Sequence, residues 1–266
     1  MTRRETLLLA VLTAALAILT VNIVLLFRQT ERQATLTREH FFWVLCQTGH
    51  SPAERLAAFH HLVADGNREW RSADLAELNL RGFSSPHADL QQAGFQRSDL
   101  TGANLAGAKL NKSSFQLTDL TDADLADADL AEAQCYRAVL KHTSMRHAVL
   151  RAAVLQEVKA VNADLMVADL SDADCLMADF SGANLTGANL TGTRLERAVL
   201  KGVNLSLVRL EGANLNEADF SDSNWWHARG FTTEQLDFLK QKFAPSTNAP
   251  PALKEDYQKW ASGSAR

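Results

Sequence analysis

Residues 118–133, with the sequence TDLTDADLADADLAEA, hold the densest cluster of groups that could do chemistry. Five aspartates and one glutamate lie within these sixteen residues, with no lysine or arginine among them. Carboxylates are the oxygen ligands that Ca²⁺ prefers, and a strip of negative charge could also imitate a nucleic-acid backbone. Two histidine pairs, His60 with His61 and His142 with His147, add imidazoles that could bind Zn²⁺. The elements that position these groups decide which chemistry is feasible.

A period of five residues organises the chain around the acidic run. Every fifth residue from Leu75 to Trp225 is Leu, Phe, Met, Cys or Trp, apart from Ser85 and Ala160, and the residue two places earlier is usually small. Residues two apart in an extended segment point to the same side. The small and the bulky residue therefore face inward, the residue between them faces water, and the other two turn the chain. A unit this short cannot bury its leucine alone and must stack on neighbours, as in solenoids.

The segments SGANLTGANLTGTRL and TDADLADADL resemble the A(D/N)LXX signature of pentapeptide repeat proteins. The resemblance extends over residues 71–229 and implies an all-β solenoid, a right-handed quadrilateral β-helix with four pentapeptides in each coil. In that register one interior ladder holds leucine at every coil from Leu90 to Leu210. Another ladder contains Cys135 and Cys175, two coils and about 9–10 Å apart, which exceeds the reach of a disulfide.

The five-residue register argues against a metal site in the acidic run. Asp119, Asp124 and Asp129 would point out of three successive faces, so their carboxylates diverge instead of converging on one ion. The members of each histidine pair would likewise point in different directions. The interior is filled by leucine and alanine, and the chain has no Gly-rich phosphate loop, no G-x-S-x-G and no Cys or His cluster at zinc spacing. We therefore expect no catalytic, cofactor or metal site and no enzymatic activity.

A belt of basic and apolar residues in the middle of the column is the candidate interaction surface. In residues 134–161 five basic residues accompany a single acid, Glu157, and valine replaces the usual outward Asp or Asn at three positions. Mixed surfaces of this kind are typical of partner sites, although single apolar residues are common on any protein surface. The belt comprises Tyr136, Arg137, Val139, Lys141, Arg146, Val149, Arg151, Val154, Met166, Val167, Leu176 and Met177.

Residues 7–27, LLLAVLTAALAILTVNIVLLF, contain no charged residue. As a helix this run would be about 31 Å long, which matches a hydrocarbon core of roughly 30 Å. It is longer than the apolar region of a signal peptide and ends without a small-residue cleavage site. We therefore expect a single-pass anchor in membrane lipid, such as a bacterial inner membrane. Arginines flank both ends, so the orientation stays open, with a slight lean towards a cytoplasmic body.

Two capping-box spacings mark helix starts on either side of the repeats, Ser51 with Glu54 and Thr232 with Gln235. The expected order is an N-terminal tail (1–6), the transmembrane helix (7–27), a helical spacer and N-terminal cap (28–70), the repeat column (71–229), a C-terminal capping helix (230–244), and a linker and tail (245–266).

The leading hypothesis for function is a membrane-anchored, non-enzymatic scaffold or protein-interaction module with an unknown protein partner. A homodimer is left open. The alternative comes from the resemblance: acidic columns in the quinolone-resistance branch of the family resemble DNA and occupy topoisomerases. The chain would then inhibit or protect a topoisomerase or another DNA-binding protein. The expected anchor and the basic belt favour the first hypothesis, and nucleic acid itself is not expected as a partner.

Overall fold

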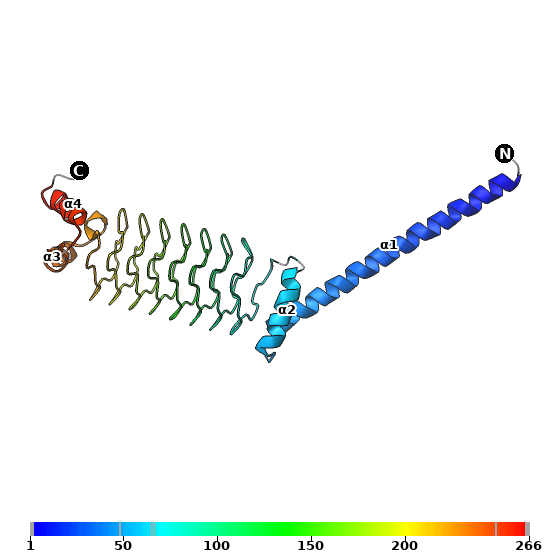
Figure 1. Ribbon diagram of the computed structural model, residues 1–266, viewed down its shortest axis with the longest axis horizontal. Helices are drawn as coiled ribbons and strands as arrows, with labels where there is room; N and C mark the ends of the chain where they lie inside the picture. Colours follow the sequence, from blue (N-terminus) through cyan, green and yellow to red (C-terminus); the bar gives the residue numbers. More distant parts are fainter. Residues whose placement is uncertain (1–2, 48, 65, 67, 248, 264–266) are drawn as a thin grey trace.

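The computed structural model describes residues 3–47, 49–64, 66, 68–247 and 249–263; the side chains of residues 3–22 and 27 lie outside the described set. The elements, in chain order, are α1 (Arg3–Cys46), α2 (Pro52–Ala64), a column of stacked coils, the 3-10 turn η1 (Trp225–His227), α3 (Thr233–Lys242) and α4 (Pro251–Ala261). Figure 1 shows an elongated molecule, with α1 and α2 at one end of the column, α3 and α4 at the other, and α1 projecting away from it.

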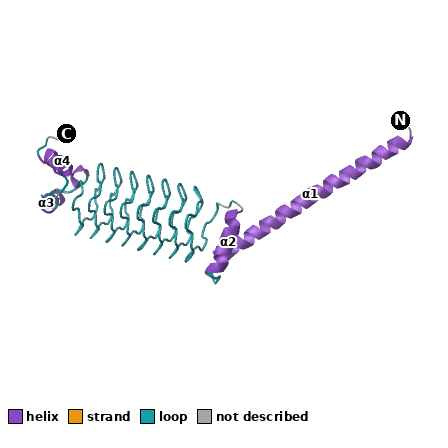
Figure 2. Cartoon of the chain, viewed as in Figure 1, coloured by secondary structure: helices purple, strands orange, loops and turns teal. Residues whose placement is uncertain are grey.

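Parallel β-bridges build the column by joining each bridge residue to the one 20 positions later, such as Asp89 to Lys109 and Asp169 to Asn189. Four such ladders run along the column, so each coil is four-sided. Each side contributes one bridge residue between two turns, and Figure 2 shows the coils without any drawn strand. The expected all-β solenoid is thus made of isolated bridges, because turns take two of every five residues and leave no room for longer strands.

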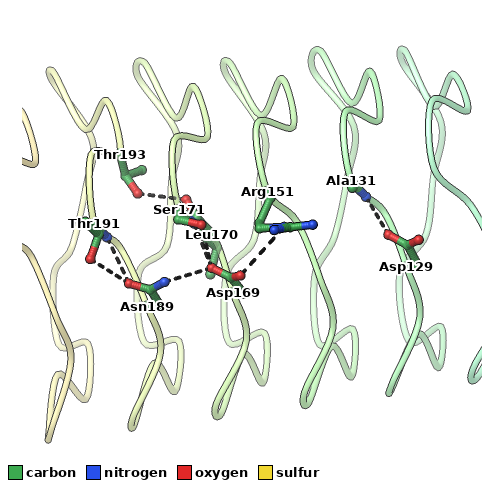
Figure 3. A network of polar contacts seen from close by, with 9 residues as sticks. All are labelled: Asp129, Ala131, Arg151, Asp169, Leu170, Ser171, Asn189, Thr191 and Thr193. Carbon is green, nitrogen blue, oxygen red and sulfur yellow. Dashed lines mark hydrogen bonds and ion pairs between the residues drawn. The ribbon is translucent and has the colours of Figure 1, made fainter.

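The interior matches the alternation of small and bulky residues predicted from the sequence. The leucines of the ladder from Leu90 to Leu210 are all buried, as are most of the small residues two places before each centre. At the exceptional position Ala160, Val158 replaces the usual small residue and both are buried, so volume is exchanged within the unit. Several buried hydroxyls bond to the neighbouring coil; Thr193 Oγ1, for example, donates to Leu170 O at 2.8 Å (Figure 3).

The corners of the column require an unusual backbone conformation. The second residue of nearly every turn has a positive φ, and most of these residues are not glycine; Ala152, for example, has φ 53°. A non-glycine residue in the left-handed region costs about 1–2 kcal/mol. Stacking between coils must therefore hold these turns in place.

α2 and the end of α1 close the first coil. Leu45 and Phe59 are buried, and the ring centroid of Phe59 lies 5.0 Å from that of Trp70. The buried Arg55 donates through Nη1 to Asp74 Oδ1 at 2.8 Å, and the backbone N of Asp74 donates to Leu45 O at 2.6 Å. The last turn of α1 is therefore bonded directly to the column.

The expected transmembrane run, residues 7–27, lies within α1, but most of its side chains are outside the described set. Among the residues that the structure describes, no helix is both long enough and apolar enough to span a membrane. From residue 28 to residue 40 α1 is exposed on all sides, and its packing against α2 begins at Phe41, whose ring stacks on His61 at 4.4 Å.

Both predicted capping boxes are confirmed. The backbone N of Ser51 donates to Glu54 Oε2 at 2.7 Å, and the backbone N of Glu54 donates to Ser51 Oγ at 3.3 Å. The same reciprocal pair joins Thr232 and Gln235 at the start of α3. Each box satisfies backbone donors that a helix start would otherwise leave free.

The C-terminal helices cover part of the last coil. Trp225 is fully buried and donates through Nε1 to Phe243 O at 3.0 Å. Asp256 of α4 accepts hydrogen bonds from Trp226 Nε1 at 2.9 Å and contacts His227 Nε2 at 2.6 Å. Within the expected linker and tail (245–266), residues 251–261 thus form a helix that packs back on the column.

Relief of one strained corner should stabilise the protein. Ala152 is exposed with φ 53°, so Ala152→Gly removes left-handed strain of about 1–2 kcal/mol against an unfolded-state entropy cost of about 0.4–1 kcal/mol. We expect a net gain of about 0.5–1 kcal/mol in chemical denaturation followed by circular dichroism. The matched control Ala153→Gly, at a buried position outside the positive-φ set, should lower stability. Equal effects of the two substitutions would contradict the strain.

The cysteines should differ sharply in reactivity. Cys135 and Cys175 are buried and free, and burial raises the pKa of Cys135 to about 12 and that of Cys175 well above its ordinary value. The reactive species is the thiolate. We expect iodoacetamide at pH 8 to modify only the exposed Cys46 in the folded protein and all three cysteines after denaturation, as measured by intact mass spectrometry. Rapid native modification at three sites would show that the interior is open.

Candidate protein-interaction surface

Three aspartates of the acidic run accept hydrogen bonds from the turns of the column. Asp119, Asp124 and Asp129 belong to three different bridge ladders, so their carboxylates diverge as predicted. Each carboxylate accepts a hydrogen bond from the backbone N two residues later; Ala131 N lies 3.1 Å from Asp129 Oδ1 (Figure 3). The sequence analysis missed this role, although Asp and Asn commonly cap turns in this way. Among the described residues, no group of three or more His, Cys, Asp or Glu could hold a metal ion.

Contacts between coils spread opposite charges over the acidic surface. Figure 3 shows Asp169, whose Oδ1 accepts from Asn189 Nδ2 at 2.9 Å and whose Oδ2 lies 3.9 Å from Arg151 Nε. Lys112 Nζ lies 3.6 Å from Glu132 Oε2 of the next coil. Further pairs join Arg71 with Asp89, Arg81 with Asp99, Arg97 with Glu77, Arg146 with Asp164, and Arg197 with Glu217. These cations interrupt any continuous strip of acid.

The predicted belt forms a ring around the column instead of one surface. Val139, Val149 and Val154 are half-buried members of three different bridge ladders. The bulky residues of the belt are likewise divided between corners, and a partner that approaches from one side can reach only part of the ring. The exposed members are Arg137, Lys141, Arg146, Arg151, Val167 and Met177, and the half-buried ones include Tyr136, Met166 and Leu176.

One corner combines the largest share of the predicted residues. We call it the tyrosine edge and define it as residues 116–117, 136–137, 156–157 and 176–177. Hydrogen bonds stack these turns one above another: Leu117 N donates to Tyr136 O at 3.0 Å and Arg137 N to Gln156 O at 3.0 Å. Leu117 and Met177 are 47% and 49% exposed, so this corner presents two large apolar side chains to solvent. The sequence analysis missed Leu117, although the vertical register places it directly beside Tyr136.

A fixed ion pair occupies the centre of the tyrosine edge. Arg137 Nε donates to Glu157 Oε2 at 2.7 Å, Tyr136 Oη donates to Glu157 Oε1 at 3.2 Å, and the Arg137 guanidinium lies 5.0 Å from the Tyr136 ring centroid. The hydrogen bond from Arg137 holds the pKa of Glu157 below its ordinary value, and Glu157 raises the pKa of Arg137. Both groups stay charged near neutral pH and offset each other. The edge therefore presents a neutral, mostly preorganised surface.

The remaining belt residues are weaker candidates for a binding surface. Arg146, Met166 and Val167 share another corner with Leu207, which is 61% exposed, but no aromatic residue joins them within the belt. Anchors at protein interfaces are most often Trp, Tyr or Arg. The tyrosine edge is therefore the better candidate.

Comparisons with known proteins agree with the repeat pattern. The family model described as pentapeptide repeats matches eight copies, which together span more than half of the chain, over residues 71–105, 98–133, 133–172, 148–187, 163–202, 178–216 and 204–224. No match is found among curated proteins.

Several solved structures are similar to the chain. HetL, a pentapeptide repeat protein involved in heterocyst differentiation regulation from the cyanobacterium Nostoc sp. strain PCC 7120, is 24% identical, with a TM-score of 0.28, and covers 65% of this chain and 95% of its own. A pentapeptide repeat protein of the Arabidopsis thaliana thylakoid lumen is 21% identical, with a TM-score of 0.30 and coverages of 48% and 82%. QnrB1, a plasmid-mediated fluoroquinolone resistance protein, is 15% identical, with a TM-score of 0.22 and coverages of 64% and 99%.

The family match rests on the same residues that form the coils, and it supports the right-handed β-helix that the A(D/N)LXX signature implied. The chain belongs to the pentapeptide repeat family.

Proposed function

We propose that the protein is a membrane-anchored, non-enzymatic scaffold that binds a protein partner along the tyrosine edge. The observation that carries this proposal is the placement of exposed Leu117 and Met177 on either side of the paired Arg137 and Glu157. Apolar side chains flanking an internally satisfied charge pair can be desolvated by a partner at little electrostatic cost, whereas an unpaired charge would oppose burial.

The rigidity of the column supports this role. Each turn of the edge is bonded to the next coil, so binding costs little backbone ordering. The interior is filled by buried side chains, which leaves the outer surface to carry function.

The anchor in this proposal rests on the uncharged run of residues 7–27, which is long enough for a bilayer. α1 continues from this run to the first coil without a break. Residues 28–46 would then hold the column about 28 Å from the membrane surface as a helix.

Site-specific photocrosslinking tests the edge. A benzoylphenylalanine at Met177 of the full-length protein in its native membrane should give a discrete crosslinked product, identified by mass spectrometry. The matched control places the same group at Asp172, an exposed turn residue of the same coil with a similarly positive φ, 59° against 56°. Leu117→Glu should reduce the Met177 product at least about fivefold, because a buried unpaired charge costs more than 1 kcal/mol.

Three outcomes would sink the proposal: no discrete product at Met177, equal products at Met177 and Asp172, or a Met177 product that Leu117→Glu leaves unchanged. Circular dichroism of the variants serves as the folding control, since Leu117 is exposed and its replacement should not disturb the core.

Imitation of DNA is the competing proposal and has less support, because cations interrupt the acidic surface. We expect the full-length protein to leave DNA gyrase supercoiling unchanged at low salt. Inhibition that weakens as salt is raised would favour the competing proposal, since screening reduces attraction between exposed charges.

A further inference from the structure

The last coil has no covering strand on the two sides that hold Leu215 and Phe220. In earlier coils two kinds of backbone N donate to the coil above. One belongs to the central residue, as Leu195 N donates to Asn214 O at 2.8 Å, and the other to the second turn residue, as Arg197 N donates to Asn216 O at 2.9 Å. The equivalent donors in the last coil, Leu215 N and Glu217 N, have no hydrogen-bond partner within the described chain. These two N–H groups form an open strand edge of the kind that another chain can extend.

The path of the chain explains why this edge is open. After the last coil, residues 225–229 cover only the opposite sides, where Leu207 N donates to His227 O and Leu210 N to Arg229 O. The chain then enters α3, which lies over the end of the column without backbone pairing to it (Figure 1). A side chain substitutes for part of the missing strand, since Gln235 Nε2 donates to Ala213 O at a long 3.4 Å.

A groove of about 620 Å³ lies between the open edge and α3. Its apolar lining comes from Leu215, Phe220, Phe238 and Leu239. Leu215 is only half-buried, whereas the other members of its ladder, from Leu75 to Leu195, are fully buried, and Phe238 is 44% exposed. The apolar surface that the next coil would cover is therefore free beside the free N–H groups.

The charges on the rim indicate what the occupant must carry. Glu217, which accepts from Arg197 Nε of the coil below at 2.7 Å, occupies the same corner position as Glu77. Arg97 lies one coil above Glu77, with its Nη1 3.6 Å from the Glu77 carboxylate. A covering strand with Arg or Lys at this corner would repeat that contact. Glu234 adds a second acid to the groove, and Lys242 is its only basic lining residue.

We propose that this groove binds an extended segment of a protein partner as an additional parallel strand. Carbonyls of the segment accept from Leu215 N and Glu217 N, and one of its N–H groups donates to Ala213 O in place of Gln235. An apolar side chain fills the space over Leu215, and a basic residue two positions later faces Glu217. Strand addition of this type derives affinity from the backbone and specificity from alternate side chains. The groove continues the corner of the tyrosine edge two coils beyond Met177, but its free N–H groups and its apolar lining include no residue of that edge.

The protein's own repeat supplies a suitable probe. Residues 191–200, TGTRLERAVL, stack in this manner on the coil below: Arg194 N donates to Ala173 O at 2.9 Å, Cys175 N to Arg194 O at 2.8 Å, and Met177 N to Glu196 O at 2.9 Å. The segment has an apolar residue, Leu195, with Arg197 two positions later. A fluorescein-labelled peptide of this sequence should bind the full-length protein saturably in detergent, as measured by fluorescence anisotropy.

Two methylated peptides test the backbone pairing without changing the protein. N-methylation at the Arg194 position removes the donor to Ala213 O and inserts a methyl group at the contact. It should weaken binding at least about tenfold, which corresponds to one lost hydrogen bond. N-methylation at the Leu195 position is the matched control, because that N–H faces the next coil above and should be free in the complex. Equal affinities of the two methylated peptides, or the absence of saturable binding, would overturn the proposal.

A pair of protein variants tests the groove. Phe238→Ser should reduce peptide affinity, whereas Leu207→Ser, which removes another exposed apolar side chain on a distant corner, should not. Light scattering tests whether the groove is instead occupied by a second copy of this chain. A dimer that Phe238→Ser dissociates, together with failure of the peptide to bind, would overturn the proposal in favour of self-association. The methylated peptides and Phe238→Ser alter no residue of the tyrosine edge, and Leu117→Glu alters no residue of the groove, so failure at either site is distinguishable from failure at the other.

Discussion

Backbone hydrogen bonds between successive coils are the interaction on which the rest of this structure depends. Each five-residue unit forms one side of a coil and contributes a single bridge residue, so no unit has a sheet of its own. Each leucine is buried only because coils lie above and below it. The same bonds hold the turns, where non-glycine residues such as Ala152 adopt positive φ. Stability, corner geometry and interior packing are thus consequences of stacking, and the column can be only as regular as its vertical register.

Stacking also determines which polar groups are occupied within the fold and which side chains a partner can reach. The carboxylates that looked like ligands, such as Asp129, accept hydrogen bonds from their own turns. Side chains at the bridge positions are half-buried beside their vertical neighbours, and the turn residues project furthest. The corners therefore carry the side chains most accessible to a partner, and one corner brings Leu117, Tyr136 and Met177 together.

A stacked column must also end, and its two ends are closed differently. At the first coil α1 and α2 supply buried aromatic residues, a buried arginine bonded to Asp74, and a direct backbone bond from Leu45. At the last coil the tryptophans and α3 cover the interior on some sides, but the strand around Leu215 keeps free donors beside an apolar groove. The regular middle of the molecule gives no such opportunity, because every coil there is covered by the next.

Periodicity predicted a stacked column with its leucines, Cys135 and Cys175 inside, and the resemblance to pentapeptide repeat proteins implied the four-sided coil that sets the interior ladders. The capping boxes could likewise be predicted, because each joins two residues only three apart in the sequence. The candidate surface was not, because residues such as Val139 and Val149, ten apart in sequence, lie on different sides, while Leu117 and Tyr136 are neighbours. The half-open last coil also depended on the path of the chain through η1 and α3. Sequence determines what repeats, whereas only the folded coils decide which side chains share a corner and which backbone groups are left uncovered.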